Sequence, residues 1–407
     1  MTETKLQGKS ERGVLATVTL SHFSQHFYAG LAILYPEIML DLDLNYTQLG
    51  IMTGAASIVS GFLQIVWSIL GRYLPRRILL GMGNIMMALG CFTLGIANSF
   101  VEAIGGSIVG GSGQAAQHPV GTSILTQKFS RDKMGWALSI HSALGYAGNI
   151  ISPILLSTVS MAMGWRPAVY ALAIVPLVTG LTVIFYLRGE EAATRSIQSR
   201  EQTNLWEDMK SALHVRSALF IIAAEAFAVG GTGMGVITTY SPLFLKNVLK
   251  LGSAETTIIY TIAVAGGVVG TIIFGRLADR FGYLKVATTI VGTCSILILL
   301  LTLHSSFNLL LVPQLFLIGA TSFATSSLLQ AQLASITTPR QRDILIGFYF
   351  TAGFGISSVW TTLIGLVIDT YKSFNPAWML RSALGAIAFT FMILASRQSP
   401  PTTKQQS

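Results

Sequence analysis

Long apolar runs recur from one end of this chain to the other, and short polar segments separate them. Each run is about as long as an α-helix must be to cross a bilayer, which is roughly 20 residues. The pattern predicts about twelve membrane-spanning helices, near residues 13–39, 46–70, 78–98, 101–126, 134–162, 166–187, 216–245, 253–275, 285–304, 307–336, 344–370 and 376–396. The expected fold is therefore that of an all-α polytopic membrane protein.

The longest polar segment lies between the sixth and seventh predicted helices and divides six helices from six. It runs from Arg188 to Arg216 and is rich in charged residues. We expect an N-terminal six-helix bundle over residues 1–187, a cytoplasmic linker over 188–215 and a C-terminal six-helix bundle over 216–407.

Short matches between the two halves indicate a duplication that gives two pseudo-symmetric bundles. Gly71-Arg72 after the second predicted helix corresponds to Gly275-Arg276 after the eighth, and Arg131-Asp132 before the fifth corresponds to Arg342-Asp343 before the eleventh. Transporters built from such repeats bind their substrate at the interface of the repeats. We expect a substrate site in the same place here.

Composition and charge agree with a lipid environment. The chain is 52% hydrophobic and 11% charged, whereas soluble domains carry about 25% charged residues. The net charge of +9 resides in Lys and Arg residues of alternate loops, so it predicts topology and not nucleic-acid binding. By the positive-inside rule, both termini are expected in the cytoplasm of a multi-pass inner (plasma) membrane protein. All but five of the 26 Lys and Arg residues then face the cytoplasm, the five being Arg166, Lys246, Lys250, Lys372 and Arg381.

Two local features concern how helices begin and pack. Asn45 followed by Gln48 predicts a capped start of the second helix, in which the Asn side chain accepts a hydrogen bond from an orphan backbone N–H. Glycines three to five residues apart in the fourth predicted helix indicate close contact with a neighbouring helix, and Pro119 predicts a kink there.

Four histidines, His22, His26, His118 and His141, fall well inside predicted spans, where an ionisable side chain is costly and often functional. His22 and His26 share one face of the first helix because they are four residues apart. His22, His118 and His141 lie at similar depths on helices one, four and five, so we expect them to converge on one cavity. Histidine changes charge near neutral pH and suits reversible protonation. The alternative is that neutral histidines only bond to helix carbonyls or serines.

Glu225 is the only acid well inside a predicted span of the second half, and it is our first choice for a proton carrier. The alternative is a hydrogen-bonded carboxylate near the cytoplasmic end of its helix. Polar side chains that are candidates for lining the pathway include Tyr28, Gln114, Gln117 and Asn149, although bonds between helices explain them equally well.

The segment Gly275-Arg276-Leu277-Ala278-Asp279-Arg280-Phe281-Gly282 with Lys285 resembles the loop signature of the major facilitator superfamily. The resemblance implies two six-helix bundles and a cytoplasmic gate motif made of Gly275, Arg276, Asp279, Arg280 and Gly282. Asp279 would accept hydrogen bonds from a helix N-terminus and pair with Arg residues, and Gly282 would supply a turn with positive φ. In the first half the corresponding loop departs from the pattern, because Gly71 stands where the family has its Asp.

Two further stretches resemble, more narrowly, the fosmidomycin-resistance type of facilitator exporter. They are the Ser21-His22 start in the first helix and the Gly-rich run that leads into His118-Pro119 in the fourth. Val120 occupies a position where that subfamily tends to have an acid, so the proton role of that acid is not carried over.

We therefore expect a secondary transporter that exports a small organic molecule or drug by proton antiport, working as a monomer in the lipid bilayer. The alternative is uptake of an organic anion or metabolite by proton coupling or facilitated diffusion, and a receptor or scaffold without transport is a third possibility. No Walker-type phosphate loop and no catalytic motif occurs, and the two cysteines, Cys91 and Cys294, lie in separate apolar runs. An enzyme, a cofactor and a metal site are not expected.

Overall fold

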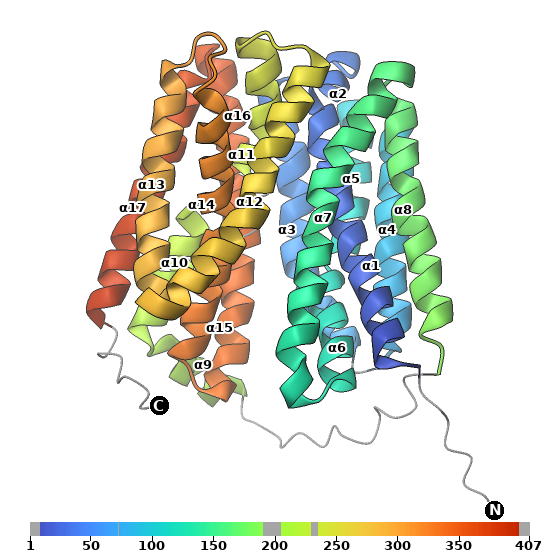
Figure 1. Cartoon of the computed structure of the whole chain (residues 1–407), viewed down its shortest axis with the longest axis vertical. Coiled ribbons are helices and arrows are strands. Elements are labelled where there is room, and N and C mark those ends of the chain that lie inside the picture. The colour runs from blue at the N-terminus through green and yellow to red at the C-terminus, as the bar shows by residue number, and fades with distance from the viewer. Residues whose placement is uncertain (1–8, 72, 190–204, 229–234, 399–407) are drawn as a thin grey trace, which may run out of the picture. The chain divides into compact units, whose positions relative to one another are not determined.

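A computed structural model describes residues 9–71, 73–189, 205–228 and 235–398 of the chain, and all regular secondary structure among them is helical (Figure 1). The first half contains α1 (Glu11–Ala29), η1 (Gly30–Leu34), α2 (Tyr35–Asp41), α3 (Tyr46–Leu70), α4 (Arg76–Gly95), α5 (Phe100–Gln114), η2 (Gln117–Gly121), α6 (Thr122–Lys128), α7 (Arg131–Met163) and α8 (Trp165–Tyr186). The second half contains α9 (Leu205–Leu213), α10 (Arg216–Ala228), α11 (Val236–Leu243), η4 (Phe244–Val248), α12 (Ser253–Phe281), α13 (Tyr283–Leu300), η5 (Leu301–Leu303), α14 (Leu311–Ser335), α15 (Pro339–Thr351), η6 (Ala352–Ile356), α16 (Ser357–Tyr371) and α17 (Asn375–Gln398).

Among these described residues, nine helical segments are long and apolar enough to cross a membrane. They correspond to nine of the twelve predicted spans. Of the other three predicted spans, the first is interrupted by the 3-10 turn η1 and the fourth by the π-helical turn η2, which contains Pro119. The seventh includes residues 229–234, which lie outside the described residues. The all-α fold predicted from the apolar runs is confirmed.

The chain separates into two compact units, residues 1–44 with 55–201 and residues 45–54 with 202–407. The predicted division after residue 187 falls close to this boundary, but the start of α3 groups with the second unit. Part of the predicted linker, residues 190–204, lies outside the described residues. The remainder differs from a plain linker, because it contains α9, whose Ala212 is fully buried in the core of the second unit.

Glycine contacts hold the first unit together, as the fourth predicted helix suggested. A Cβ atom placed on Gly106 of α5 would lie 2.8 Å from the backbone N of Leu94 in α4, and one on Gly83 of α4 would lie 2.8 Å from the backbone O of Gly113. Such distances are too short for a side chain. The two helices can therefore approach this closely only because glycine stands at the contact.

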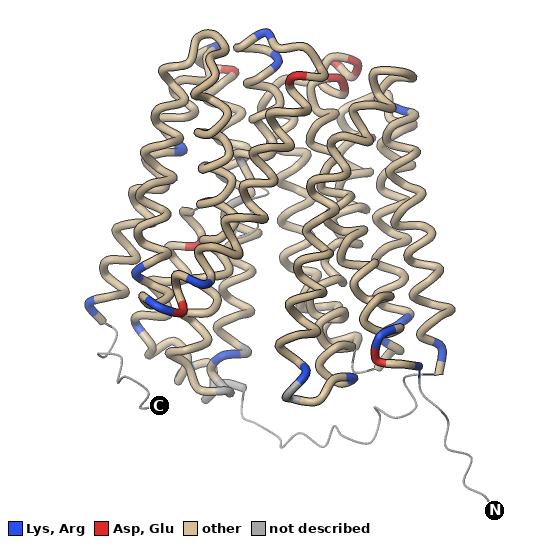
Figure 2. Tube along the Cα trace, viewed as in Figure 1, with Lys and Arg blue, Asp and Glu red and all other residues tan. Residues whose placement is uncertain are grey.

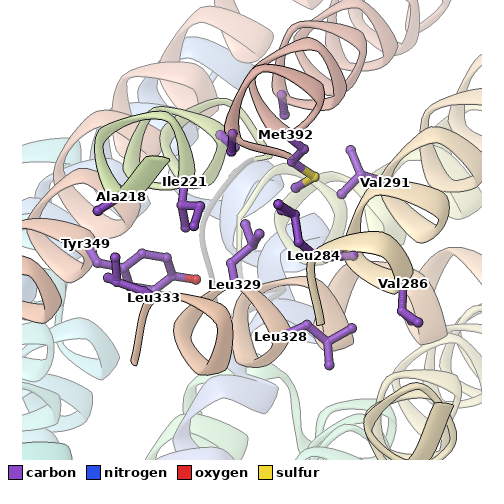
Figure 3. Packing of buried hydrophobic residues seen from close by; sticks show 14 of the residues in the cluster. Ala218, Ile221, Leu284, Val286, Val291, Leu328, Leu329, Leu333, Tyr349 and Met392 are labelled. Carbon is purple, nitrogen blue, oxygen red and sulfur yellow. The ribbon is translucent and has the colours of Figure 1, made fainter. Parts of the chain in front are cut away.

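The second unit packs around an apolar core to which several helices contribute (Figure 3). Ile221 of α10, Leu329 of α14, Tyr349 of α15 and Met392 of α17 are all fully buried there. Tyr349 is the polar exception, and its hydroxyl group belongs to the candidate site described below.

Charged residues gather at the helix ends of each unit (Figure 2). In the first unit, Lys133 at the start of α7 lies 3.1 Å from Glu11 at the start of α1, and Arg77 at the start of α4 donates to the backbone O of Ile184 near the end of α8. At the opposite end, Arg166 pairs with Asp41. The clustering of basic residues at one end agrees with the predicted topology, whose orientation toward the cytoplasm stays a prediction.

Arg381 corrects the expectation that every Lys and Arg lies in a loop. It is inside α17, is only 4% exposed, and donates from Nη2 to the backbone O of Ala228 at 2.8 Å. Ala228 is the last described residue of α10. A buried guanidinium group at this point therefore has a local structural role.

The start of α3 is capped twice. Asn45 and Gln48 bond to each other's backbone N–H at 2.8 and 2.9 Å, which confirms the predicted cap. Asp369 near the end of α16 accepts hydrogen bonds from the backbone N atoms of Tyr46 and Thr47 at 3.2 and 2.7 Å, and from Thr47 Oγ1 at 2.5 Å. The carboxylate thus satisfies the first N–H groups of α3 and lies at the positive end of its dipole.

Asp369→Ala should therefore lower the free energy of unfolding by about 1–2 kcal/mol, the usual cost of losing a helix cap. Thermal unfolding of the purified chain measures the loss. Thr370→Ala is the control, because among the described residues the Thr370 hydroxyl bonds only to the backbone O of Leu366 in its own helix. Equal melting temperatures for the two variants would show that the cap contributes nothing.

Candidate functional site

Four histidine rings meet in the interior of the first unit. The ring centroid of His22 lies 4.6 Å from that of His26, 5.8 Å from that of His118 and 4.4 Å from that of His141, with His22 and His141 stacked. We call these four residues the histidine cluster. The structure brings together the histidines that the sequence predicted would converge.

The four rings come from three elements of the chain. His22 and His26 are one turn apart on α1, His141 is on α7, and His118 lies in the π-helical turn η2. A π-helical turn places its side chains differently from the α-helix on either side, and such turns often mark functional sites. His22 and His141 are buried, whereas His26 and His118 remain partly exposed.

Hydrogen bonds join the rings to one another and to α7. His22 Nδ1 is 3.1 Å from the backbone O of His141, and His22 Nε2 is 3.0 Å from His26 Nε2. His26 Nδ1 is 3.3 Å from Asn149 Oδ1. The chain of contacts runs from a backbone carbonyl through two imidazole rings to a buried amide.

Small residues of α7 make room for the cluster. A Cβ atom on Gly145 would collide with the His22 ring, and one on Gly148 would collide with the backbone of α1 at Phe23. One turn further along, Ser152 donates its hydroxyl hydrogen to the backbone O of Phe27 at 2.5 Å. The small side chains at these positions of α7 therefore allow α1 and α7 to approach closely.

A second polar chain lies on another side of α1. Asn84 of α4 donates from Nδ2 to the backbone O of Leu80 and to Ser21 Oγ, and Ser21 donates in turn to Gln117 Oε1 at 2.6 Å. Gln117 thus bonds between helices, which is the structural alternative given above. Its Nε2 has no hydrogen-bond partner among the described residues.

Of the other predicted pathway residues, one contacts the histidine cluster and two do not. Asn149 joins the histidine cluster. Tyr28 is buried against Gly110 of α5. Gln114 accepts a hydrogen bond at its backbone O from the Gln25 side chain. The contacts of Tyr28 and Gln114 among the described residues do not include a histidine of the cluster.

Tyr146 was missed as a site residue, although it follows Gly145 directly in the sequence. Its ring centroid lies 4.7 Å from that of His26. Thr19 was also missed, and its Oγ1 is 3.4 Å from His141 Nδ1. The signal for Thr19 was its position three residues before His22 on the same helix face.

Glu225 lies in the interior of the second unit, on α10, and is 1% exposed. Ser326 of α14 donates from Oγ to Glu225 Oε1 at 3.1 Å. The Tyr349 hydroxyl is 2.9 Å from Ser326 Oγ and donates to the Ser326 backbone O at 2.8 Å. Glu225 is therefore part of a buried network of hydroxyl groups, and Ser326 and Tyr349 are members that the sequence did not reveal.

The gate motif is partly as expected. Gly282 ends α12 with φ of 93°, which confirms the predicted positive φ. Asp279 Oδ1 accepts a hydrogen bond from the Tyr283 hydroxyl at 2.9 Å, and among the described residues it accepts none from a helix N-terminus. Arg280 stacks on Phe281. In the part of the chain that the structure describes, Asp279 makes no ion pair with Arg276 or Arg280, and its role in a cytoplasmic latch stays a prediction.

A metal ion has no ready-made site in the described part of the chain. No three His, Cys, Asp or Glu side chains there are placed to share one ion. Two histidines of the cluster use their nitrogens to bond to each other instead.

Titratable side chains buried within helical spans are characteristic of membrane transport proteins. Residues 15–361 match the family model described as the Major Facilitator Superfamily, and the chain belongs to this family. It is a membrane-embedded secondary transporter that works by alternating access, and the family consists of transporters and not enzymes.

Relatives and solved structures agree with this assignment. An MFS-type efflux pump from Mycolicibacterium smegmatis is 24% identical over 394 residues, covering 91% of this chain and 87% of the relative. A probable L-galactonate transporter from Escherichia coli is 22% identical over 391 residues, covering 90% and 85%. The solved structure of the nucleoside transporter NupG has a TM-score of 0.80 at 14% identity, covering 94% of this chain and 99% of that one, so it is similar in fold.

The contact between Gly145 and His22 generates a prediction about packing. Gly145→Ala should lower the free energy of unfolding by about 1–3 kcal/mol, because the added methyl group overpacks against the imidazole ring. Gly135→Ala is the matched control on the same helix, where a Cβ atom would meet nothing within 4 Å. Thermal unfolding of both variants tests this, and a Gly145 variant as stable as the control would contradict the close packing.

Proposed function

We propose that this chain is a proton-coupled exporter that expels a small organic molecule or drug from the cytoplasm by antiport. The proposal places both termini in the cytoplasm, the protein in the inner membrane, and the functional unit in one monomer. The observation that carries it is the 3.0 Å contact between His22 Nε2 and His26 Nε2. Two imidazole nitrogens at this distance must have a proton between them, because two bare nitrogens would repel each other.

Proton coupling also has a candidate carrier in the second unit. Glu225 is buried among hydroxyl groups, which are able to bond to both the charged and the neutral form of a carboxyl group. We assign the histidine cluster and Glu225 as the two groups that take up and release protons during transport.

The export direction is supported by the similarity to the efflux pump from Mycolicibacterium smegmatis and by the Ser21-His22 and His118-Pro119 stretches that resemble fosmidomycin-resistance exporters. A second candidate is proton-coupled uptake of an organic anion. It is favoured by the hydrogen bonds of the His22–His26 pair, which among the described residues include no carboxylate. A protonated cluster would then suit an anionic solute that moves with the proton.

Glu225→Gln should abolish solute-driven proton movement, because the amide cannot bind and release a proton, while the chain still folds. The measurement is quenching of a pH-sensitive dye in membrane vesicles. Glu255→Gln makes the same chemical change at the start of α12 and should transport normally. Full activity of the Glu225 variant would remove this residue from the mechanism.

The function itself is tested with inside-out vesicles that carry an imposed proton gradient. Phosphonates, organic anions and cationic drugs are added in turn. Collapse of the gradient by a solute would support antiport export and would give the chemical class of the substrate. Entry of an anion together with protons into right-side-out vesicles would support the second candidate, and specific binding without flux in either preparation would indicate a receptor.

A further inference from the structure

The hydrogen-bond chain through the histidine cluster has one end whose direction is fixed. A backbone carbonyl only accepts hydrogen bonds, so His22 Nδ1, which lies 3.1 Å from the His141 carbonyl O, must carry a hydrogen. One proton also lies between His22 Nε2 and His26 Nε2. Three of the four ring nitrogens of this pair are thereby accounted for.

The charge of the pair is decided at the remaining nitrogen, His26 Nδ1. If Nδ1 is bare, the two rings share two protons and the pair is neutral. If Nδ1 also carries a hydrogen, the rings hold three protons and one positive charge, whichever ring holds the middle proton. The proton that the pair gains or loses is therefore at His26 Nδ1.

Asn149 is the partner of this nitrogen, and its amide has two different ends. A bare Nδ1 requires the donating NH₂ group of Asn149, whereas a protonated Nδ1 requires the accepting oxygen. In the structure Oδ1 faces His26 Nδ1 at 3.3 Å, and Nδ2 is buried without a hydrogen-bond partner among the described residues. This arrangement suits the protonated pair.

We propose that the Asn149 side-chain amide turns over when the His22–His26 pair gains or loses its proton, which makes Asn149 a positioning residue for the proton site. In the protonated state the amide presents an N–H group on its far side, and in the neutral state it presents a carbonyl oxygen there. This far side is buried in the present arrangement, so a solute would meet these opposite hydrogen-bonding groups only in an arrangement that opens it. The role in solute coupling rests on the proposed function above.

Among the described residues, the groups around the His22–His26 pair include no fixed charge that bonds to either ring. The titratable side chains that face it are His118 from η2 and His141 and Tyr146 from α7. The helices α4, α6 and α8 also pack against α1. In the described part of the chain they provide no Asp, Glu, Lys or Arg that bonds to either ring.

The test is a pH titration of the full chain in lipid nanodiscs, labelled with ¹⁵N-histidine and read by NMR. The ¹⁵N shifts distinguish bare from protonated ring nitrogens, and His22→Gln and His26→Gln variants assign the signals. We expect His22 Nδ1 to stay protonated at every pH and His26 Nδ1 to gain its proton as the pH falls. A bare His22 Nδ1 would overturn the proposal.

Two substitutions of Asn149 should move the titration in opposite directions. Asn149→Asp supplies a group that accepts and carries negative charge, so the midpoint should rise by one pH unit or more, a tenfold or greater increase in proton affinity. Asn149→Leu removes the amide's hydrogen bond to His26 Nδ1 in both states. Because the bond to the charged ring is the stronger of the two, protonation should require lower pH. Asn84→Leu is the control, because among the described residues Asn84 bonds to Leu80 and Ser21 and not to a histidine, and its midpoint should match the unmodified chain.

An unchanged midpoint in either well-folded Asn149 variant would overturn the proposal. If one variant folds poorly, the other still provides the test. The titrations need no solute, so absence of proton-coupled transport would sink the proposed function and leave this result standing. If both hold, the pH profile of solute exchange should shift in Asn149→Asp in the same direction as the NMR midpoint.

Discussion

Hydrogen-bonding groups inside a bilayer must find their partners within the protein, since water is not there to replace a missing one. This constraint gives the histidine cluster its order. The carbonyl of His141 requires a hydrogen on His22 Nδ1, so Nε2 is the nitrogen of His22 that faces His26. The protonation of His26 Nδ1 then determines which end of the Asn149 amide bonds to it. In water each ring would choose its tautomer independently. In the interior of a helical unit one backbone oxygen sets the direction of the whole chain.

The constraint acts through packing, because imidazole rings bond to a neighbouring helix only if that helix is close. Gly145 and Gly148 of α7 leave the space in which α1 and its rings lie. Glycine in a helix interior costs about 0.8–1.0 kcal/mol relative to alanine. The glycines lower the helix propensity of α7 along one face. In exchange, they allow the polar face of α1 to contact the backbone carbonyl of His141.

The sequence was informative where a property depends on spacing along one helix. The apolar runs located the helices, the pair Asn45 and Gln48 predicted a cap that forms, and the four-residue interval between His22 and His26 placed both rings on one face. It was silent where the property depends on how neighbouring helices are rotated. Ser326 and Tyr349 are ordinary polar residues in sequence and become partners of Glu225 only through the packing of α10, α14 and α15. Arg381 was misplaced for the same reason, since nothing in sequence marks the end of α10 as its partner.

The partners of the two proton-site candidates share a chemical property that fixed charges lack. A guanidinium or ammonium group only donates, so it stabilises one protonation state of its neighbour and opposes the other. The Ser326 hydroxyl beside Glu225 can donate or accept, and the Asn149 amide beside His26 can do either by turning over. Each site therefore retains a hydrogen bond on both sides of a protonation step. In these surroundings an unmade bond to a buried group costs about 1–3 kcal/mol. Partners that can either donate or accept therefore lower the free-energy difference between the protonated and deprotonated states. A small difference is the condition for a proton to bind and leave in every cycle.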